Sequence, residues 1–238
     1  MEKSNGDRFI SAYNRLDQGL RSIYNIKQSL GFGEVVRKVA PINSVIRKYE
    51  DDLIECGRLR NAIVHGAGDT LIAEPNTEVV EKIEQIARIV TTPPRVIDVL
   101  PKRKVFVVDG NKTIGNICSN VFESGFSIVP VQIKGTIVGV INRKMIVDAI
   151  GAAIKANMSV DKLLKQPVAT GLDALLNETN HYEIAPSSIT IDSMLFMFQQ
   201  NRKLSAVIIT KNGNYNEEPL AVVVTSDTLD LQTVLDNY

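Results

Sequence analysis

The chain has 238 residues, which exceeds the ~100 to 200 residues of a typical single domain, so two domains are expected. Lysine plus arginine total 27, and aspartate plus glutamate also total 27. The balance holds along the chain, with 13 charges of each sign in residues 1–90 and 14 of each sign in residues 91–238. This balance excludes the basic excess of an unspecific nucleic-acid binder, so any contact with RNA has to be local.

Localisation and metal binding are constrained by what the sequence lacks. The opening "MEKSNGDRF" is not a secretory signal, and no apolar run approaches the ~18 residues needed to cross a bilayer. Cys56 and Cys118 lack CxxC spacing, and His65 and His181 lie far apart. We therefore predict a cytoplasmic protein with no membrane partner, reduced and packed thiols, no metal site and no required cofactor.

The first part of the chain has helical periodicity. In residues 7–30 an apolar side chain recurs every three or four positions, which predicts a long amphipathic helix. The pattern continues through Val39 to Pro41, where a helix has to end or begin. Further helices are predicted in residues 42–64 and 77–90, the latter capped by Asn76 or Thr77. Residues 1–92 are therefore predicted to form an all-α helical bundle.

The segment "TTPPR" at residues 91–95 breaks this pattern, because consecutive prolines favour an extended linker. Beyond it come five short runs rich in β-branched residues, each beside a helical pattern. This alternation is typical of an α/β domain, here residues 95–238. The predicted strands are residues 104–109, 127–133, 136–141, 205–210 and 220–225.

The second domain contains an internal repeat. Residues 112–150 align with residues 189–231 once the insertion "NGNYNEE" is set aside. Each copy is expected to run strand, helix, strand, strand, helix (β-α-β-β-α), and two such units can bury their apolar sheet faces by packing on one another. The aligned pairs are Thr113 with Thr190, Ile114 with Ile191, Ser127 with Ser205, and Gly139 with Ala221.

Residues 95–235 resemble a tandem pair of CBS domains, a Bateman module, in the segments "FSIVPVQIKGTIVGVI" and "LSAVIITKNGNYNEEPLAVVVTSD". The family pattern is a small-residue strand, often with proline, and a Gly-apolar-apolar-Thr-x-x-Asp segment that opens the last helix. The resemblance places repeat one at about residues 95–152 and repeat two at about 158–238. It implies a regulatory adenosine ligand, which would be AMP, ADP, ATP or S-adenosylmethionine, in clefts between the repeats.

The second repeat keeps the family's aspartate as Asp227, which in the family accepts hydrogen bonds from both ribose hydroxyls. Thr225 and Ser226 stand where the resemblance implies phosphate contacts at a helix start. In the first repeat Asn142 takes the threonine place and Met145 the aspartate place, so that cleft is expected to be empty or altered. Arg143 could still meet a phosphate there. The structural alternatives are that Asp227 is an ordinary first-turn residue and that Arg143 belongs to a solvated face.

The segment "RLRNAIVHG" at residues 58–66 carries a second candidate site. Arg60, Asn61 and His65 form the pattern R-N-x-x-x-H, which resembles the motif of HEPN RNases. The resemblance implies metal-independent RNA cleavage, in which the histidine exchanges protons and the arginine stabilises charge on phosphorus. One histidine cannot easily perform both proton transfers. The resemblance therefore also implies a homodimer, with two motifs facing one groove.

The same segment has a structural explanation. Gly66 is expected to end the helix, and the helix dipole would stabilise the protonated His65 there. Arg58 and Arg60 can donate to the terminal carbonyls or pair with Glu55.

Three functions remain open from the sequence. The CBS pair senses an adenine nucleotide and controls an HEPN-like RNase, or it regulates a non-catalytic dimerisation or docking domain, or it has lost its ligand and serves as a scaffold.

Overall fold

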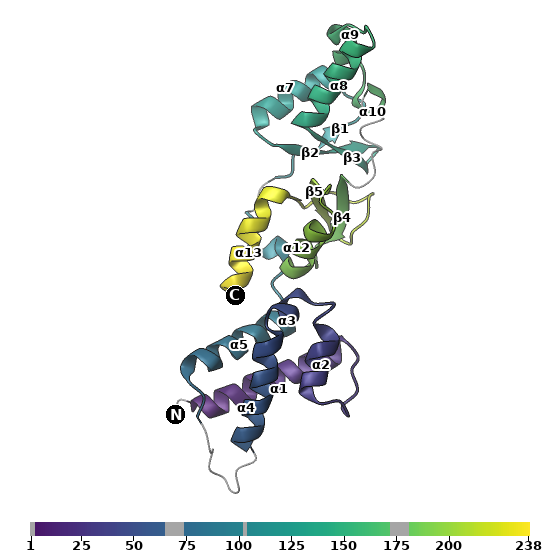
Figure 1. Cartoon of the computed structure of the whole chain (residues 1–238). Coiled ribbons are helices and arrows are strands. Elements are labelled where there is room, and N and C mark those ends of the chain that lie inside the picture. The colour runs from purple at the N-terminus through teal and green to yellow at the C-terminus, as the bar shows by residue number, and fades with distance from the viewer. Residues whose placement is uncertain (1–2, 65–73, 102–103, 172–180) are drawn as a thin grey trace. The chain divides into compact units, whose positions relative to one another are not determined.

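The computed structural model describes residues 3–64, 74–101, 104–171 and 181–238 (Figure 1). The chain divides into two compact units. The first, the helical unit, comprises Met1–Pro94 with Val234–Tyr238, and the second, the α/β unit, comprises Arg95–Thr233.

The described part of the helical unit before Pro94 is built from helices. They are α1 (Asn5–Ile23), α2 (Phe32–Val39), α3 (Ser44–Lys48), α4 (Glu50–Val64) and α5 (Thr77–Thr91). Their apolar faces form one core, in which Phe9, Leu16 and Leu20 of α1 are fully buried. This described part is all-helical, as the periodicity of the sequence predicts, but the end of the first helix differs from the prediction.

Helices α1 and α5 run parallel. Near their starts, the Asn5 side chain donates to the Pro75 carbonyl at 3.2 Å. Near their ends, Gly19 lies against Thr91, and a β-carbon at Gly19 would come within 2.6 Å of Thr91 Cγ2. Glycine therefore allows the two helices to approach this closely.

The single helix predicted over residues 7–30 is wrong at its end, because α1 stops at Ile23. Asn25 adopts a left-handed φ of 50°. The chain is then held in a turn by the buried Arg21, whose guanidinium donates to the Lys27 carbonyl at 2.8 Å and to the Leu30 carbonyl at 2.9 Å. A side chain thus satisfies backbone carbonyls of the turn that follows α1.

The N-cap of α5 gives a first testable prediction. Asn76 Oδ1 accepts a hydrogen bond from the Val79 N–H at 2.9 Å, as the sequence predicts. We expect Asn76→Ala to lower the free energy of unfolding of the helical unit by about 1 kcal/mol, because one N–H at the helix start loses its partner. Urea unfolding monitored by circular dichroism measures this. Asn76→Asp keeps the acceptor, so a loss equal to that of the alanine variant would contradict the capping role.

The α/β unit contains two three-stranded sheets of the same topology (Figure 1). In each, the first strand pairs parallel with the second, and the second pairs antiparallel with the third. The first copy runs β1 (Val108–Asp109), α7 (Ile114–Ser124), β2 (Ile128–Ile133), β3 (Thr136–Asn142) and α8 (Arg143–Lys155). The second runs β4 (Tyr182–Pro186), α12 (Ile191–Gln200), β5 (Ala206–Thr210), β6 (Ala221–Val224), the 3-10 turn η1 (Thr225–Asp227) and α13 (Thr228–Asp236). This is the β-α-β-β-α order expected from the sequence.

The two copies match residue by residue. Thr113 and Thr190 are the N-caps of α7 and α12, and each hydroxyl accepts a backbone N–H at 3.3 Å. Gly139 pairs with Val131 in the first sheet, and Ala221 pairs with Ile209 in the second. Both stand three residues before the end of the third strand. The alignment made from the sequence is therefore structurally correct at these positions.

The two copies also exchange their leading segments. Helix α6 (Val96–Val99) precedes the first copy, yet the Val96 N–H donates to the Ile189 carbonyl of the second copy at 3.1 Å. Helix α10 (Val168–Gly171) precedes the second copy, and the Val168 N–H donates to the Lys112 carbonyl of the first copy at 2.9 Å. Val96 and Val168 are both fully buried. Each copy thus completes its core with the segment that leads into the other.

The strand predictions fail at the first strand of each copy. The strand expected over residues 104–109 forms only as the two-residue β1, and β4 was not predicted. Only Ala185 of β4 is buried, so its sequence lacks the apolar run that marks β5, in which all five residues are buried. Between the copies, α9 (Val160–Leu164) follows α8.

Candidate functional site

The predicted ligand residues lie at the starts of α8 and α13, which are equivalent positions in the two copies. In the first copy the Asn142 side chain accepts a hydrogen bond from the Met145 N–H at 2.9 Å. In the second copy the direction is reversed, because Asp227 Oδ2 accepts from the Val224 N–H at 2.8 Å. Each copy therefore keeps one half of a capping box. The structural alternative for Asp227 accounts for one of its two carboxylate oxygens.

Asp227 is half-buried in the turn η1, and Thr225 and Ser226 beside it are exposed. The Thr228 hydroxyl donates to the Thr225 carbonyl at 2.7 Å and tightens the turn. The Thr225 hydroxyl donates weakly to the Leu204 carbonyl, at 3.5 Å. The second carboxylate oxygen of Asp227 and the hydroxyls of Thr225 and Ser226 thus lie within three consecutive residues at a helix start. Such a group can accept hydrogen bonds from a diol and donate to phosphate oxygens.

The corresponding place in the first copy has different chemistry. Met145 is 5% exposed and packs in the core of that copy. Arg143 is exposed, and Lys144 forms an ion pair with Asp148 one turn along α8. Because a buried thioether offers no acceptor for a sugar hydroxyl, the two copies are not equivalent as ligand sites.

The two sheets pack on each other through apolar side chains. Ile137 and Val140 of the first sheet and Ile208 of the second are buried together. Ile128, Tyr182 and Ile184 pack against them, and burial raises the pKa of Tyr182. This contact buries the sheet faces that the repeat predicts would pack together.

The insertion that distinguishes the second copy forms an ordered loop that also reaches the first. The Ile137 N–H of β3 donates to the Tyr215 carbonyl in this loop at 2.7 Å. The Glu217 carboxylate holds the loop, accepting from the Asn212 N–H at 2.7 Å and from the Asn212 side chain at 2.6 Å. Sequence reasoning missed Glu217. The two asparagines that surround the insertion's only glycine were the available signal, since asparagine favours turns.

Glu217 provides a pH prediction. Its pKa is lowered from 4.5 to about 2, chiefly by the hydrogen bond from the Asn212 N–H and then by that from the Asn212 side chain. Because the folded-state pKa is depressed, the loop is stabilised above pH 4.5 and loses that stabilisation as the pH falls toward 2. An NMR titration of the Glu217 carboxyl should give a midpoint near 2. Asn212→Ala should move the midpoint upward, and an ordinary midpoint in the wild type would contradict the bonding described.

The helical motif is only partly within the described residues. His65 and Gly66 lie outside them. Arg58 pairs with Glu55 at 2.6 Å, as the structural alternative predicts. The Arg60 guanidinium lies 6.0 Å from the centre of the Tyr13 ring, and its buried Nε donates no hydrogen bond within the part of the chain that the structure describes. Asn61 is exposed, and its Oδ1 lies 3.5 Å from Arg60 Nη1.

Tyr13 fixes the position of Arg60. It packs against Phe32, with ring centres 4.5 Å apart, and burial raises its pKa to about 12, with the nearby Asp17 adding to the rise. The phenol therefore stays neutral at physiological pH. An aromatic face in this position attracts a cation, which stabilises the guanidinium where it lies.

The described residues offer neither a metal site nor a membrane-spanning helix. Among the residues that the structure describes, no three histidine, cysteine, aspartate or glutamate side chains gather as a metal site. In the same ranges no helix has the length and apolar character to span a bilayer. Both cysteines are half-buried and free, and burial raises the pKa of Cys118 and raises that of Cys56 to about 11.

No protein-family model matches the sequence, and no curated protein matches it. Solved structures that resemble the chain include CBS-domain proteins. The CBS domain of a bacterial CNNM/CorC family Mg2+ transporter in complex with ATP is 21% identical, covers 64% of this chain and 95% of its own, and has a TM-score of 0.45. A CBS domain pair in complex with 5′-methylthioadenosine and S-adenosyl-L-methionine is 14% identical, with coverage of 60% and 98% and a TM-score of 0.43.

A third similar structure is a CBS-domain containing protein from Agrobacterium tumefaciens, 18% identical, with coverage of 55% of this chain and 85% of its own and a TM-score of 0.41. All three TM-scores lie below 0.5. The duplicated topology of the α/β unit, with its exchanged leading segments and packed sheets, is an observation independent of these similarities.

Proposed function

We propose that residues 95–238 form a CBS pair that binds an adenosine-containing nucleotide and through it regulates the helical unit. The single observation that carries the proposal is the duplication itself. Two β-α-β-β-α copies pack their sheets face to face and exchange buried leading segments through equivalent hydrogen bonds. Solved CBS-domain structures with ATP, and with S-adenosylmethionine, indicate the class of ligand to test first.

The proposed ligand site belongs to the second copy. The free carboxylate oxygen of Asp227 would accept the ribose hydroxyls, while Thr225 and Ser226 would donate to phosphate oxygens at the start of α13. In the first copy, the side chains of Asn142 and Arg143 would donate hydrogen bonds to a phosphate. Because Met145 is buried there, we propose one complete adenosine site rather than two.

The test is a thermal-shift series with AMP, ADP, ATP and S-adenosylmethionine, and with UMP as the control. A ligand that binds the folded state at 100 times its Kd stabilises it by about 2.7 kcal/mol, so the melting temperature should rise with at least one adenosine compound. UMP should leave it unchanged. If no adenosine compound shifts the transition at millimolar concentration, the nucleotide-sensing proposal is wrong.

For the helical unit we propose an HEPN-like domain that acts as a homodimer and cleaves RNA under control of the nucleotide. The sequence motif of Arg60, Asn61 and His65 supports this role, and so does the placement of Arg60 beside Tyr13, with a buried Nε that has no hydrogen-bond partner among the described residues. The test is cleavage of fluorogenic RNA by the wild type, His65→Ala and Arg60→Ala, each with and without the bound nucleotide. Cleavage that persists in His65→Ala, or none in the wild type, would end the RNase proposal.

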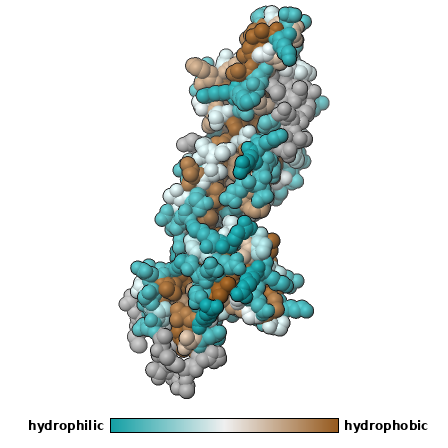
Figure 2. All heavy atoms as spheres, viewed as in Figure 1, coloured by the Kyte–Doolittle hydropathy of each residue, from teal (hydrophilic) through white to brown (hydrophobic). Residues whose placement is uncertain are grey.

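The second candidate is a non-catalytic dimerisation or docking scaffold. The first copy exposes large apolar side chains on α7 and α8, and Figure 2 shows apolar surface on the chain's α/β unit. They include Phe122, which is 84% exposed, Val147 at 66% and Ile154 at 61%. Light scattering with and without nucleotide tests this candidate. A change of mass with nucleotide, in the absence of RNA cleavage, would favour the scaffold over the RNase.

A further inference from the structure

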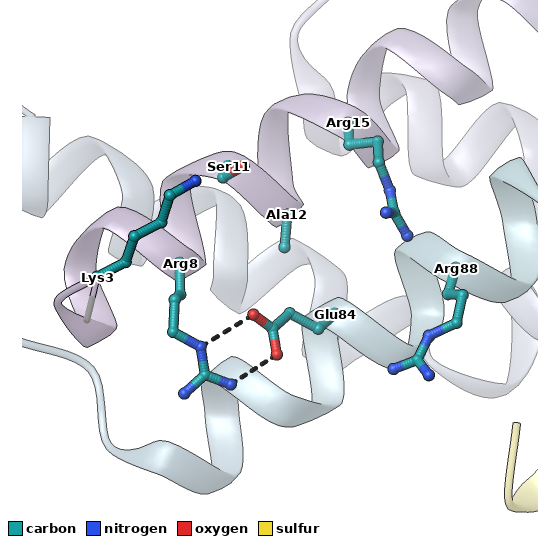
Figure 3. Close-up of a pocket in the computed structure, with 7 residues that line it drawn as sticks. All are labelled: Lys3, Arg8, Ser11, Ala12, Arg15, Glu84 and Arg88. Carbon is teal, nitrogen blue, oxygen red and sulfur yellow. Dashed lines mark hydrogen bonds and ion pairs between the residues drawn. The ribbon is translucent and has the colours of Figure 1, made fainter. Parts of the chain in front are cut away.

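A basic groove lies between α1 and α5 on the helical unit (Figure 3). Its volume is about 240 Å³. Four cationic side chains line it, together with one carboxylate and the hydroxyl of Ser11. The cations are Lys3, Arg8, Arg15 and Arg88, and the carboxylate is Glu84.

Glu84 neutralises only one of these cations. Arg8 donates to both of its oxygens, from Nε at 3.0 Å and from Nη2 at 2.7 Å. Lys3, Arg15 and Arg88 form no ion pair with any residue that the structure describes. Four positive charges and one negative charge leave the groove with a net charge of +3, although residues 1–90 as a whole carry equal numbers of positive and negative side chains.

The positive charge of the groove lowers the pKa of Glu84. The pKa of Glu84 is lowered first by its hydrogen bonds to Arg8, and the charges of Arg8, Arg88 and Arg15 lower it further. Figure 3 shows the side chains of Arg8 and Arg15 extending from α1 toward α5, where Arg88 lies. Arg15 and Arg88 are exposed, so their guanidinium groups are open to a ligand in solution.

The spacing suits a ligand with more than one anionic group. Arg8 and Arg15 are seven residues apart on α1, which corresponds to about 10.5 Å along a helix. Guanidinium groups bind phosphate oxygens in a bidentate manner. The lining includes no aromatic residue and, apart from Ala12, no apolar one, so the groove offers no surface on which a nucleobase could stack.

We propose that this groove binds a ligand carrying two or more phosphate groups, held by Arg15 and Arg88, with Arg8 fixed in place by Glu84. The site is independent of the nucleotide site assigned to Asp227, which lies in the other unit. The site would bind closely spaced phosphates without recognising a base. Inorganic polyphosphate, the polyphosphate chain of a nucleotide and the backbone of single-stranded RNA all present such phosphates. A local basic site also gives a chain of balanced charge a means of neutralising RNA phosphates.

The experiment measures binding of two probes to the full chain: inorganic tripolyphosphate by calorimetry, and a labelled oligouridylate by fluorescence anisotropy. The double variant Arg15→Ala/Arg88→Ala should weaken binding at least tenfold and reduce the slope of log affinity against log salt by about 1.5 for the oligonucleotide. The matched control is Arg37→Ala/Lys38→Ala, which removes two exposed cations of α2 and should change neither quantity.

A further variant keeps the outcome decisive. Glu84→Gln keeps a partner for Arg8 but removes the negative charge, so it should tighten binding. Loss of tripolyphosphate binding in Arg15→Ala/Arg88→Ala separates this site from the proposed adenosine site, because both arginines belong to the helical unit. Binding of tripolyphosphate alone identifies a polyphosphate ligand, and binding of the oligonucleotide alone or of both identifies RNA. If neither probe binds, or if the Arg15→Ala/Arg88→Ala variant binds as well as the wild type, the proposal is overturned.

Discussion

Asp227→Ala is expected to weaken adenosine-nucleotide binding at least 100-fold. The proposed contact is a pair of hydrogen bonds from ribose hydroxyls to a charged acceptor, and each such bond contributes about 1.5 to 3 kcal/mol. The same change removes the acceptor of the Val224 N–H, which costs about 1 kcal/mol of stability. Calorimetric titration with the nucleotide that gives the largest thermal shift measures the first effect, and the melting temperature without ligand measures the second.

Two variants separate the two roles of Asp227. Asp227→Asn keeps an oxygen for the Val224 N–H but turns an amide toward the ribose, so stability should be retained while affinity falls. Thr190→Ala removes the N-cap of α12 in the same copy and touches no proposed ligand residue, so stability should fall while affinity is retained. If Asp227→Ala binds the nucleotide like the wild type, Asp227 is a capping residue only and the proposed site has to be abandoned.

The sequence predicted the parts of the fold that depend on residues close together in the chain. Helix faces followed from apolar spacing, and the start of α5 was expected at Asn76 or Thr77, of which Asn76 is the N-cap. The repeat was recognisable because both copies keep a threonine cap before the first helix, Thr113 and Thr190. The alignment also placed Met145 opposite Asp227, and the structure assigns these two residues to the same position of α8 and the η1 turn.

Contacts between distant segments were not predictable in this way. The end of α1 depends on Arg21 reaching carbonyls six and nine residues further on. The strand β4 exists because β5 lies beside it in parallel, although its own sequence is weakly apolar. The exchanged segments at Val96 and Val168 pair with partners far along the chain. For the candidate site, the sequence named the residues, but not the hydrogen bond that already uses one oxygen of Asp227.

The second large effect is expected at the contact between the two sheets. Ile208 is fully buried, and it joins Ile137 and Val140 across the two copies. Ile208→Ala is expected to lower the free energy of unfolding by about 2 to 5 kcal/mol, because the change removes buried methyl groups and leaves a cavity. Urea unfolding of the full chain measures this loss. Ile208→Val removes a single methylene group and should cost only about 0.5 to 1.5 kcal/mol.

Comparing Ile208 with its neighbour on β5 tests the packing of the two copies more sharply than the loss of stability alone. Its neighbour Ile209 is equally buried but projects from the opposite face of β5, since side chains alternate along a strand. Both alanine variants should be destabilised, but only Ile208→Ala weakens the packing between the two copies. Ile208→Ala should therefore also weaken nucleotide binding in a cleft between the copies. Equal loss of affinity in the two variants would mean that binding follows the stability of the second copy alone. It would contradict a ligand site that depends on the packing of both copies.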